Sequence, residues 1–398
     1  MRVSTAQFHQ QSINSVLRQQ SATAQTLEQI SSGKRVNTAG DDPVASIGID
    51  NLKQENTLID QYLKNIDYAD NKLSVAESTL GSAESLSRTI KDQMLSLTNG
   101  RHSDDDIQAI ATEMKSNLEA LQSLANTRDE SGNYIFAGFE TEQQPFEFGS
   151  GTPRTISYQG DSGVRNSVIS SGVLQATNIA GDAAFMNGEN AIGDYSVNYQ
   201  AGQTGEFSIS SAKFDASAAN PAANYTLAFV DDNSGGVNVN YTDSSGAPQT
   251  TAFTNPLVID GVELKFDGVP AIGDSVAISE QSQVSIFDTI EQAITLAESG
   301  ELQNPNGQAE MAQILDNMNQ GINQIGMARS EAGIGLSNTE SYAMRHEEAK
   351  LVNTSAQSKL EDLDLASAIS EFEKQQLALN AASSLFSRVS STTLFDFI

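Results

Sequence analysis

The chain has 398 residues, no cysteine, no tryptophan and a formal net charge of −29 at pH 7, from 51 acidic and 22 basic side chains. This length allows two or three domains. The absence of cysteine excludes disulfides, thiolate metal ligands and a cysteine nucleophile, and the acidic charge disfavours nucleic acid or an anionic membrane surface as a partner.

The N-terminal residues predict no secretory signal. Residues 1–10 (MRVSTAQFHQ) lack the unbroken apolar run that a signal peptide carries after its basic residue. No stretch approaches the roughly 18 apolar residues of a membrane helix. We therefore expect no membrane insertion, and we expect any export to use a route that does not read such a signal.

The first predicted helix covers residues 4–32 and carries a stripe of mixed polarity. Its members recur at three- and four-residue spacing and are Ile13, Val16, Gln20, Thr23, Leu27 and Ile30. Gly33 is a typical helix stop, and Lys34 and Arg35 follow where cations favour a helix C-terminus. Asp42-Pro43 then predicts a new helix, with Asp42 as N-cap and Pro43 at the first position.

The strongest helical pattern runs through residues 52–97. Apolar side chains recur there without a slip, and the predicted core positions are Ile59, Ile66, Leu73, Leu80 and Ile90. Such a helix is roughly 70 Å long at ~1.5 Å per residue. Ser103 with Asp106 then predicts a capping box for a third helix, whose apolar face holds Ile107, Ala111, Met114, Leu118, Leu121 and Ala125.

Between about residues 133 and 280 the pattern changes to two-residue alternation, which predicts antiparallel β-structure in one or two modules. The alternating segments are 156–158, 195–199, 207–209, 225–227, 237–241 and 262–266. Asp260-Gly261 is typical of a tight hairpin turn. Residues 231–236 (DDNSGG) resemble a calcium loop, but Gly235 and Thr242 stand where ligands are needed, so we predict a turn.

Helical spacing returns at Val284. A short helix near 286–297 precedes a long one over 307–345, whose predicted core residues are Leu315, Met318, Ile322, Ile325 and Leu336. Gly333 and Gly335 interrupt this helix and predict close packing or a local bend. The last helix has a stripe diluted by Gln376, Ser383 and Ser390, and its apolar members are Leu365, Ile369, Phe372, Leu379 and Phe386.

The order of helices, β-structure and helices predicts an α+β fold. Both chain ends contribute to a long antiparallel helical bundle or coiled coil, into which an antiparallel β domain is inserted. We predict a terminal coiled-coil assembly domain (1–42 and 356–398), a helical rod domain (43–132 and 284–355) and an outer β domain (133–283).

No catalytic residue, cofactor or metal site is predicted. His346-Glu347 is not a zinc-protease motif, because Lys350 stands where the second histidine is needed. Residues 104–106 (DDD) lie at a predicted helix start, where acidic side chains are favourable without a metal. No phosphate-binding glycine motif occurs, so we expect a protein that is not an enzyme.

The two terminal helices need a partner. Their polar-diluted stripes bury little apolar surface, which contributes roughly 25 cal/mol per Å². We therefore predict that they are largely disordered in the monomer and fold when copies assemble. The predicted assembly interface comprises Ile13, Val16, Leu27, Ile30, Leu365, Ile369, Phe372, Leu379, Phe386, Leu394, Phe395 and Phe397.

Residues 27–43 (LEQISSGKRVNTAGDDP) resemble the N-terminal signature of the flagellin family, and residues 363–389 resemble its C-terminal arm. Residues 132–139 (GNYIFAGF), Pro145-Phe146 and the apolar tip at 394–398 (LFDFI) resemble the hook–filament junction branch of that family more than its filament-forming branch.

The resemblance implies terminal helices that line the flagellar channel, a rod that makes the subunit contacts and a β domain that faces outward. It implies a structural adaptor, assembled as a ring or tube of identical subunits, that joins hook-associated protein 1 to flagellin. It also implies type III export without a cleaved signal peptide, a flagellar export chaperone that binds the C-terminal arm, and an extracellular location on the flagellum.

Two alternatives stay open. The chain could be a flagellin, the filament subunit, which abundance in sheared filaments would reveal. It could also be a flagellin-like frame that displays an adhesive or enzymatic β domain. That alternative requires a ligand or pocket in the outer domain, such as one for carbohydrate or a host protein.

Overall fold

The computed structural model describes residues 5–99, 102–151, 153–215 and 221–391. The chain forms two compact units, one from Met1–Lys64 with Tyr342–Ile398 and the other from Asn65–Ser341. Helices α2 (Pro43–Leu97) and α6 (Pro305–Glu361) contribute to both. The predicted division into three parts stays a prediction, because it concerns positions in an assembly, whereas the two units reflect packing within one chain.

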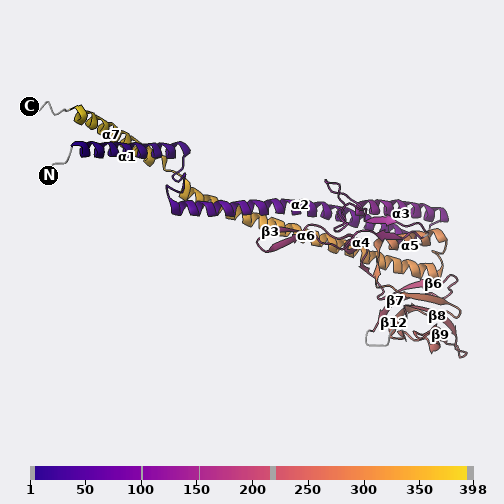
Figure 1. Cartoon of the computed structure of the whole chain (residues 1–398). Helices are drawn as coiled ribbons and strands as arrows, with labels where there is room; N and C mark the ends of the chain where they lie inside the picture. The colour runs from indigo at the N-terminus through magenta and orange to yellow at the C-terminus, as the bar shows by residue number, and fades with distance from the viewer. Residues whose placement is uncertain (1–4, 100–101, 152, 216–220, 392–398) are drawn as a thin grey trace, which may run out of the picture. The chain divides into compact units, whose positions relative to one another are not determined.

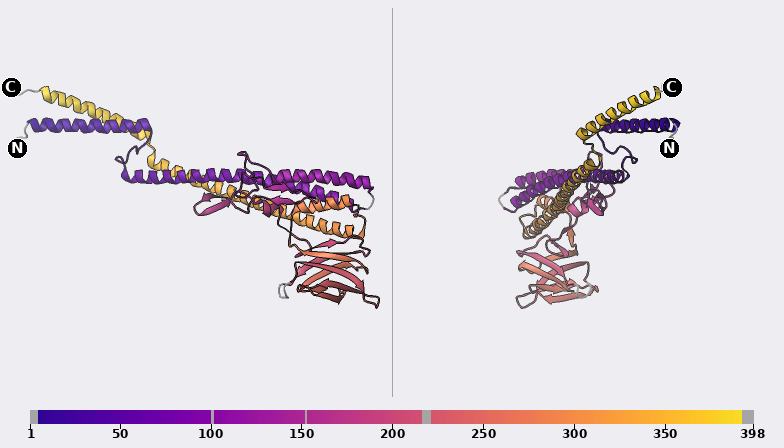
Figure 2. Two further views of the ribbon diagram at one scale, coloured as in Figure 1. Left: turned by 45° about the vertical axis from the view of Figure 1, so that its right-hand side comes forward. Right: turned by 90° about the vertical axis from the view of Figure 1, so that its left-hand side faces the viewer.

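In the first unit, α1 (Thr5–Ser32) lies antiparallel to α7 (Leu365–Ser391), as the views in Figure 1 and Figure 2 agree. The start of α2 lies along the end of α6. There the Tyr62 ring stacks on His346 with centroids 5.3 Å apart, and Lys350 Nζ lies 2.5 Å from Asp60 Oδ1. The predicted stop of α1 at Gly33 is confirmed, with a φ of 71°.

The predicted helix over 307–345 is longer in the structure. Helix α6 continues to Glu361 and so enters the segment 356–398 that we predict as part of the terminal assembly domain. Helix α7 begins at Leu365 because the Asp364 carboxylate accepts hydrogen bonds from Ala366 N at 3.1 Å and Ser367 N at 3.2 Å. Helical spacing runs on across this break, so periodicity hides it, and a capping aspartate is the local signal.

In the second unit, α3 (Asp104–Ala125) and α5 (Ile286–Ser299) pack with parts of α2 and α6 around one apolar core. The predicted capping box of Ser103 and Asp106 is confirmed, and the whole predicted apolar face of α3 is buried. The predicted rod residues Ile66, Leu73, Leu80, Ile90, Met318, Ile322 and Ile325 are buried, while Leu315 and Leu336 are partly buried against the core. Ile59 is buried in the first unit.

Residues 133–189 pack on these helices. They form the hairpins β1 (Phe146–Phe148) with β2 (Ile156–Tyr158) and β3 (Asn166–Ser170) with β4 (Val173–Ala176), followed by α4 (Gly181–Phe185). Phe146 and Phe185 lie with Phe287 of α5 in an aromatic cluster, with ring centroids 5.3 to 5.7 Å apart. The first part of the predicted outer β domain, residues 133–189, therefore contributes to the helical core.

The described residues between 190 and 283 form two antiparallel sheets that share one apolar core around Phe207, Phe229 and Phe266. Their strand orders are β10-β9-β8-β13-β6 and β11-β12-β7. The strands are β6 (Tyr195–Tyr199), β7 (Phe207–Phe214), β8 (Asn224–Asp231), β9 (Val237–Thr242), β10 (Pro248–Ala252), β11 (Leu257–Ile259), β12 (Val262–Gly268) and β13 (Ser275–Glu280), and β5 (Gly188–Glu189) pairs with β14 (Gln283–Val284). All six predicted alternating segments are confirmed as strands.

The predicted turns are also confirmed. Residues 231–236 connect β8 to β9, and Asp232 Oδ1 accepts hydrogen bonds from Ser234 N and Gly236 N, both at 2.7 Å. Asp260 and Gly261 connect β11 to β12 with φ values of 47° and 84°. Two consecutive positive φ angles are what a two-residue type I′ turn requires.

Candidate assembly interface

The face on which α1 and α7 meet is of mixed polarity, with Val16, Ile30, Phe372 and Leu379 half-buried beside polar side chains. Thr26 is only 8% exposed, and its hydroxyl donates a hydrogen bond to Gln375 Oε1 at 3.0 Å. Gln19 Nε2 donates to the Gln375 carbonyl at 3.3 Å. Each such bond contributes about 1 kcal/mol net. Because its apolar side chains are only half-buried, the pair gains part of the apolar burial that stabilises most helix contacts.

Other large apolar side chains of the same pair are exposed. On α1, Ile13, Leu17 and Leu27 are 40, 57 and 52% exposed. On α7, the exposed residues are Leu365 at 50%, Ile369 at 48%, Leu377 at 70% and Leu385 at 64%. Rows of exposed large apolar side chains are typical of a surface that another chain covers.

The structure divides the predicted interface residues between two faces. Ile13, Leu27, Leu365 and Ile369 are exposed, whereas the half-buried ones are Val16, Ile30, Phe372 and Leu379. The backbone of Phe386 lies in α7 and its side chain is not among those described, while Leu394, Phe395 and Phe397 lie outside the described residues. Their role in assembly stays a prediction.

Sequence reasoning missed three of the exposed leucines, Leu17, Leu377 and Leu385. Leu17 follows Ile13 by one helical turn, and Leu385 follows Leu377 by two turns, on a side of α7 rotated away from Leu365 and Ile369. Residues four apart lie on one face of a helix. A search for a second apolar row beside the first would therefore have found them.

We call helices α1 and α7 the arms. A short crossing of two chain segments, residues 33–35 with 361–363, ties one arm to the other, and we call it the arm crossing. Leu363 N donates to the Gly33 carbonyl at 3.0 Å, and Arg35 N donates to the Glu361 carbonyl at 2.6 Å. The Lys34 ammonium lies 2.5 Å from the buried Glu361 carboxylate. The hydrogen bond from Lys34 is the main reason that the pKa of Glu361 lies below its ordinary value.

Contacts beside the arm crossing hold the start of α2. Arg35 Nη2 donates to the Leu360 carbonyl at 2.8 Å, and Arg35 Nη1 lies 3.2 Å from Asp42 Oδ2. A Cβ on Gly48 would lie 3.3 Å from Leu360 Cδ1, so the two helices approach closely here. A small apolar core with Leu360 at its edge consists of Val36, Ala45 and Ile49. The segment that resembles the flagellin signature thus fixes where α1 ends and α2 begins.

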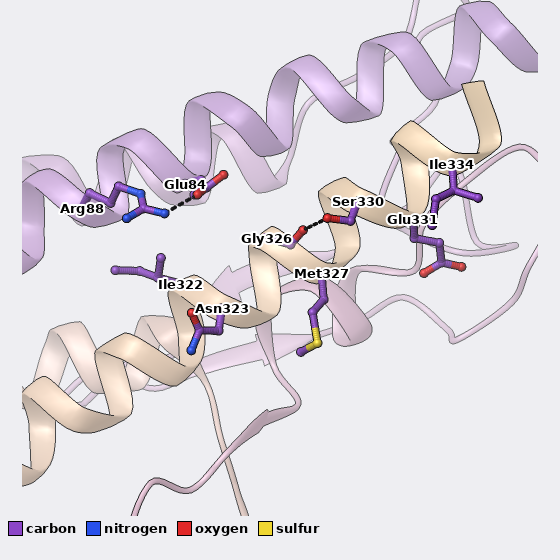
Figure 3. A pocket seen from close by; sticks show the side chains of 9 residues that line it. All are labelled: Glu84, Arg88, Ile322, Asn323, Gly326, Met327, Ser330, Glu331 and Ile334. Carbon is purple, nitrogen blue, oxygen red and sulfur yellow. Dashed lines mark hydrogen bonds and ion pairs between the residues drawn. The ribbon is translucent and has the colours of Figure 1, made fainter. Parts of the chain in front are cut away.

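A shallow groove of about 560 Å³ lies between α2 and α6 in the second unit (Figure 3). On the α2 side, Glu84 Oε1 pairs with Arg88 Nη2 at 2.5 Å, and this bond is the main reason that the pKa of Glu84 is lowered. On the α6 side, Met327 and Ile334 are 60 and 63% exposed. An apolar strip framed by charges is typical of a contact with another protein.

A hydrogen bond of 3.0 Å joins Ser96 Oγ and His102 Nε2 near the turn between α2 and α3, a pairing that the sequence analysis did not find. A catalytic triad also needs a carboxylate on the second ring nitrogen. The neighbouring Asp106 instead accepts hydrogen bonds from Ser103 N at 3.1 Å and Ser103 Oγ at 2.8 Å, as the helix cap. This pair therefore closes a turn.

The described part of the chain has neither a metal-binding group of side chains nor a membrane-spanning helix. Its histidine and carboxylate side chains form no group of three or more that could hold a metal ion. None of its helices is long and apolar enough to cross a membrane.

Known proteins resemble this chain in sequence and in fold. The family model for the bacterial flagellin N-terminal helical region matches residues 3–141. Flagellar hook-associated protein 3 of Salmonella typhimurium is 34% identical over 151 residues, which cover 38% of this chain and 48% of that protein. Phase 1 flagellin of Salmonella naestved is 24% identical over 146 residues, 36% of this chain and 28% of the flagellin.

The crystal structure of the flagellar junction protein FlgL from Legionella pneumophila is similar with a TM-score of 0.66 at 25% identity. That similarity covers 79% of this chain and 99% of the FlgL chain. The matched part of this chain spans about half the length of the curated hook-associated relatives.

Proposed function

We propose that this chain is a member of the flagellin family and a structural subunit of the bacterial flagellum, at the junction of hook and filament. Copies of it form a ring or tube that joins hook-associated protein 1 to flagellin, and it catalyses no reaction. The likeness to a solved junction protein over nearly all of that protein's length is the observation that carries this choice. The higher identity to hook-associated protein 3 than to a flagellin supports it.

The paired terminal helices are the part of the chain that assembles. Burying one exposed leucine or isoleucine fully is worth about 1.5 to 3 kcal/mol, and α7 alone exposes Leu365, Ile369, Leu377 and Leu385. Neighbouring copies that cover these side chains stabilise the tube, whereas one pair of helices in isolation gains its polar contacts and the partial burial of a few apolar side chains. This difference fits the prediction that the terminal helices become ordered only when copies assemble.

The arm crossing acts as the positioning element of this interface. The Lys34–Glu361 contact and the backbone bonds around it hold the end of α1 at the start of α7. Because both arms leave from this crossing, their exposed rows stay in register with each other. A weakly packed pair of arms also suits a chain that is exported unfolded through a type III apparatus, with a chaperone on its C-terminal arm.

A deletion strain tests the proposal. We expect hooks to form, filaments to be lost and flagellin to accumulate in the medium, and we expect the wild-type gene to restore filaments. Leu377→Ser with Leu385→Ser should fail to restore them although the protein is made and folded. Recovery of this chain as the main protein of sheared filaments would identify it as a flagellin and overturn the junction role.

A further inference from the structure

A polar cleft of about 520 Å³ lies in the second unit, between the hairpin of α5 and α6 and the edge strand β6. Figure 1 shows β6 beside these two helices. Ser196 and Asn198 of β6 line it, on the face of the strand opposite to the buried Tyr195 and Val197. The cleft is separate from both the arms and the α2–α6 groove.

The first turns of α6 present a polar row to this cleft. Its members are spaced by four, three and four residues, so they share one helix face, and they are Asn306, Glu310, Gln313 and Asn317. A helix face that packs toward another layer is usually apolar. Four amide and carboxylate side chains in a row therefore need an explanation other than packing.

Helix α5 presents a second row with the same spacing. Asp288, Gln292, Thr295 and Ser299 line the cleft from this side. The two rows come from consecutive antiparallel helices, so the cleft is walled by two polar faces. The side chains of the second row are half-buried or exposed, which leaves this wall accessible from solvent.

Two acceptor atoms in the first row lack partners. Asn306 is 4% exposed, and its Oδ1 accepts no hydrogen bond from the described residues. The Gln313 Oε1 atom is buried and likewise unpaired within the described chain. Buried acceptors without donors are costly and uncommon. Both atoms are covered in this structure but belong to side chains that line the cleft, so rotation of each amide toward the cleft would present its oxygen to a donor there.

The charges of the lining exclude several ligand classes. It contains the carboxylates of Asp288, Glu301 and Glu310 and no lysine or arginine. An anion would therefore meet repulsion, and burial already raises the pKa of Glu310. A cation offers only donors, and would leave the N–H groups of Gln292 and Gln313 without acceptors. Hydroxyl groups both donate and accept, as these amides and carboxylates together require.

We propose that this cleft binds a neutral, multiply hydroxylated ligand, a sugar of one or two rings, with Asn306, Glu310 and Gln313 accepting its hydroxyl hydrogens. The volume of about 520 Å³ lies within the range of small-ligand sites. This binding activity goes beyond the junction role and does not depend on it. It gives the part of the chain outside the assembly arms a ligand of its own.

The experiment uses the full chain and saturation-transfer NMR. The probes are lactose, N,N′-diacetylchitobiose and trehalose, with spermidine as the cationic probe and glucose 6-phosphate as the anionic one. We expect saturable binding of at least one neutral disaccharide, with a Kd on the order of 1 mM or tighter. Saturation by spermidine without any sugar binding, or no saturable sugar signal up to about 10 mM, would overturn the proposal.

Variants then locate the bound sugar. Gln313→Ala should raise the Kd about fivefold and the isosteric Glu310→Gln about tenfold or more, as expected for a neutral and a charged hydrogen bond. Gln308→Ala, an exposed glutamine of the same helix, is the matched control and should leave the Kd unchanged.

Thermal melting confirms that each variant is folded, and if Gln313→Ala is not, Glu310→Gln decides. Sugar binding that none of the cleft variants weakens would contradict the site. Filament formation in the deletion strain reports on the junction role separately.

Discussion

The contact between α1 and α7 and the core of the second unit are both helix–helix contacts, but opposite side chains build them. Between α1 and α7, Thr26 and Gln375 lie beside half-buried apolar side chains, while Leu17, Leu377 and Leu385 are exposed. In the second unit, Leu73, Leu80 and Met318 are 1% exposed or less. We therefore expect the second unit to fold alone and the exposed side chains of α1 and α7 to be covered by neighbouring chains, as the proposed assembly requires.

The largest expected effect comes from a charge in the buried core. Leu73→Asp removes a fully buried apolar side chain and buries a carboxylate without a partner, which costs about 5 kcal/mol or more. We expect the second unit to unfold, measured as loss of helical circular dichroism at 25 °C. A soluble variant with full helicity would show that this core is assigned wrongly.

A smaller loss should follow from breaking the arm crossing. Glu361→Ala leaves the Lys34 ammonium without its partner, and we expect a loss of about 2 kcal/mol, as for a hydrogen bond to a charged group. Hydrogen exchange at the amides of Arg35 and Leu363 should accelerate. Asp60→Ala breaks the exposed pair with Lys350 and should cost about 0.5 kcal/mol. Equal effects of the two changes would contradict a positioning role.

Acid should weaken the arm crossing in the same way. The folded pKa of Glu361 is lowered, so its ionised form favours folding. Its contribution is complete above the unfolded pKa of about 4.3 and is lost as the pH falls through the folded value. Asp364 shifts in the same direction, chiefly through the hydrogen bond from Ser367. Protection at the crossing, measured as exchange relative to the intrinsic rate at each pH, should therefore fall between about pH 5 and pH 3, and Glu361→Gln should flatten this fall.

Two glycines of α6 offer a matched pair with effects near 1 kcal/mol. A Cβ on Gly333 meets nothing within 4 Å, so Gly333→Ala should stabilise by up to about 1 kcal/mol through helix propensity. A Cβ on Gly335 would lie 2.7 Å from Leu73 Cδ1 and 2.9 Å from Gln175 Nε2. Gly335→Ala should therefore destabilise by about 1 kcal/mol. Urea unfolding compares them, and stabilisation by both would argue against tight packing at Gly335.

The smallest effect on folding should come from the arms. Leu377→Asp places a charge on a side chain that is 70% exposed, so the melting temperature of the monomer should change little. Assembly should nevertheless fail in the complementation experiment. A fall in melting temperature comparable to that of Leu73→Asp would place Leu377 in the core of the monomer and remove the contrast between the two regions.

Mild proteolysis sharpens the same contrast in the wild-type chain. If the arms become ordered on assembly, proteases should trim both ends of the monomer and spare the second unit. Arms as resistant as the second unit would count against that prediction.

Local sequence patterns determined most of the secondary structure. The capping box at Ser103, the N-cap at Asp42 and the hairpin at Asp260-Gly261 depend on neighbouring residues, so the sequence predicts them directly. The same holds for the core stripe through Leu73 and Leu80, because an unbroken apolar spacing has a single buried face. The resemblance of both chain ends to the flagellin family was likewise readable from the sequence.

Tertiary structure decided what depends on residues far apart in the chain. A stripe of mixed polarity does not say which side faces its partner, so only the placement of α7 shows that Thr26 is covered and Leu17 is exposed. The Lys34–Glu361 contact and the cleft between β6, α5 and α6 join segments that no local spacing relates. Periodicity encodes the shape of one element, whereas the chemistry of a site depends on which elements meet.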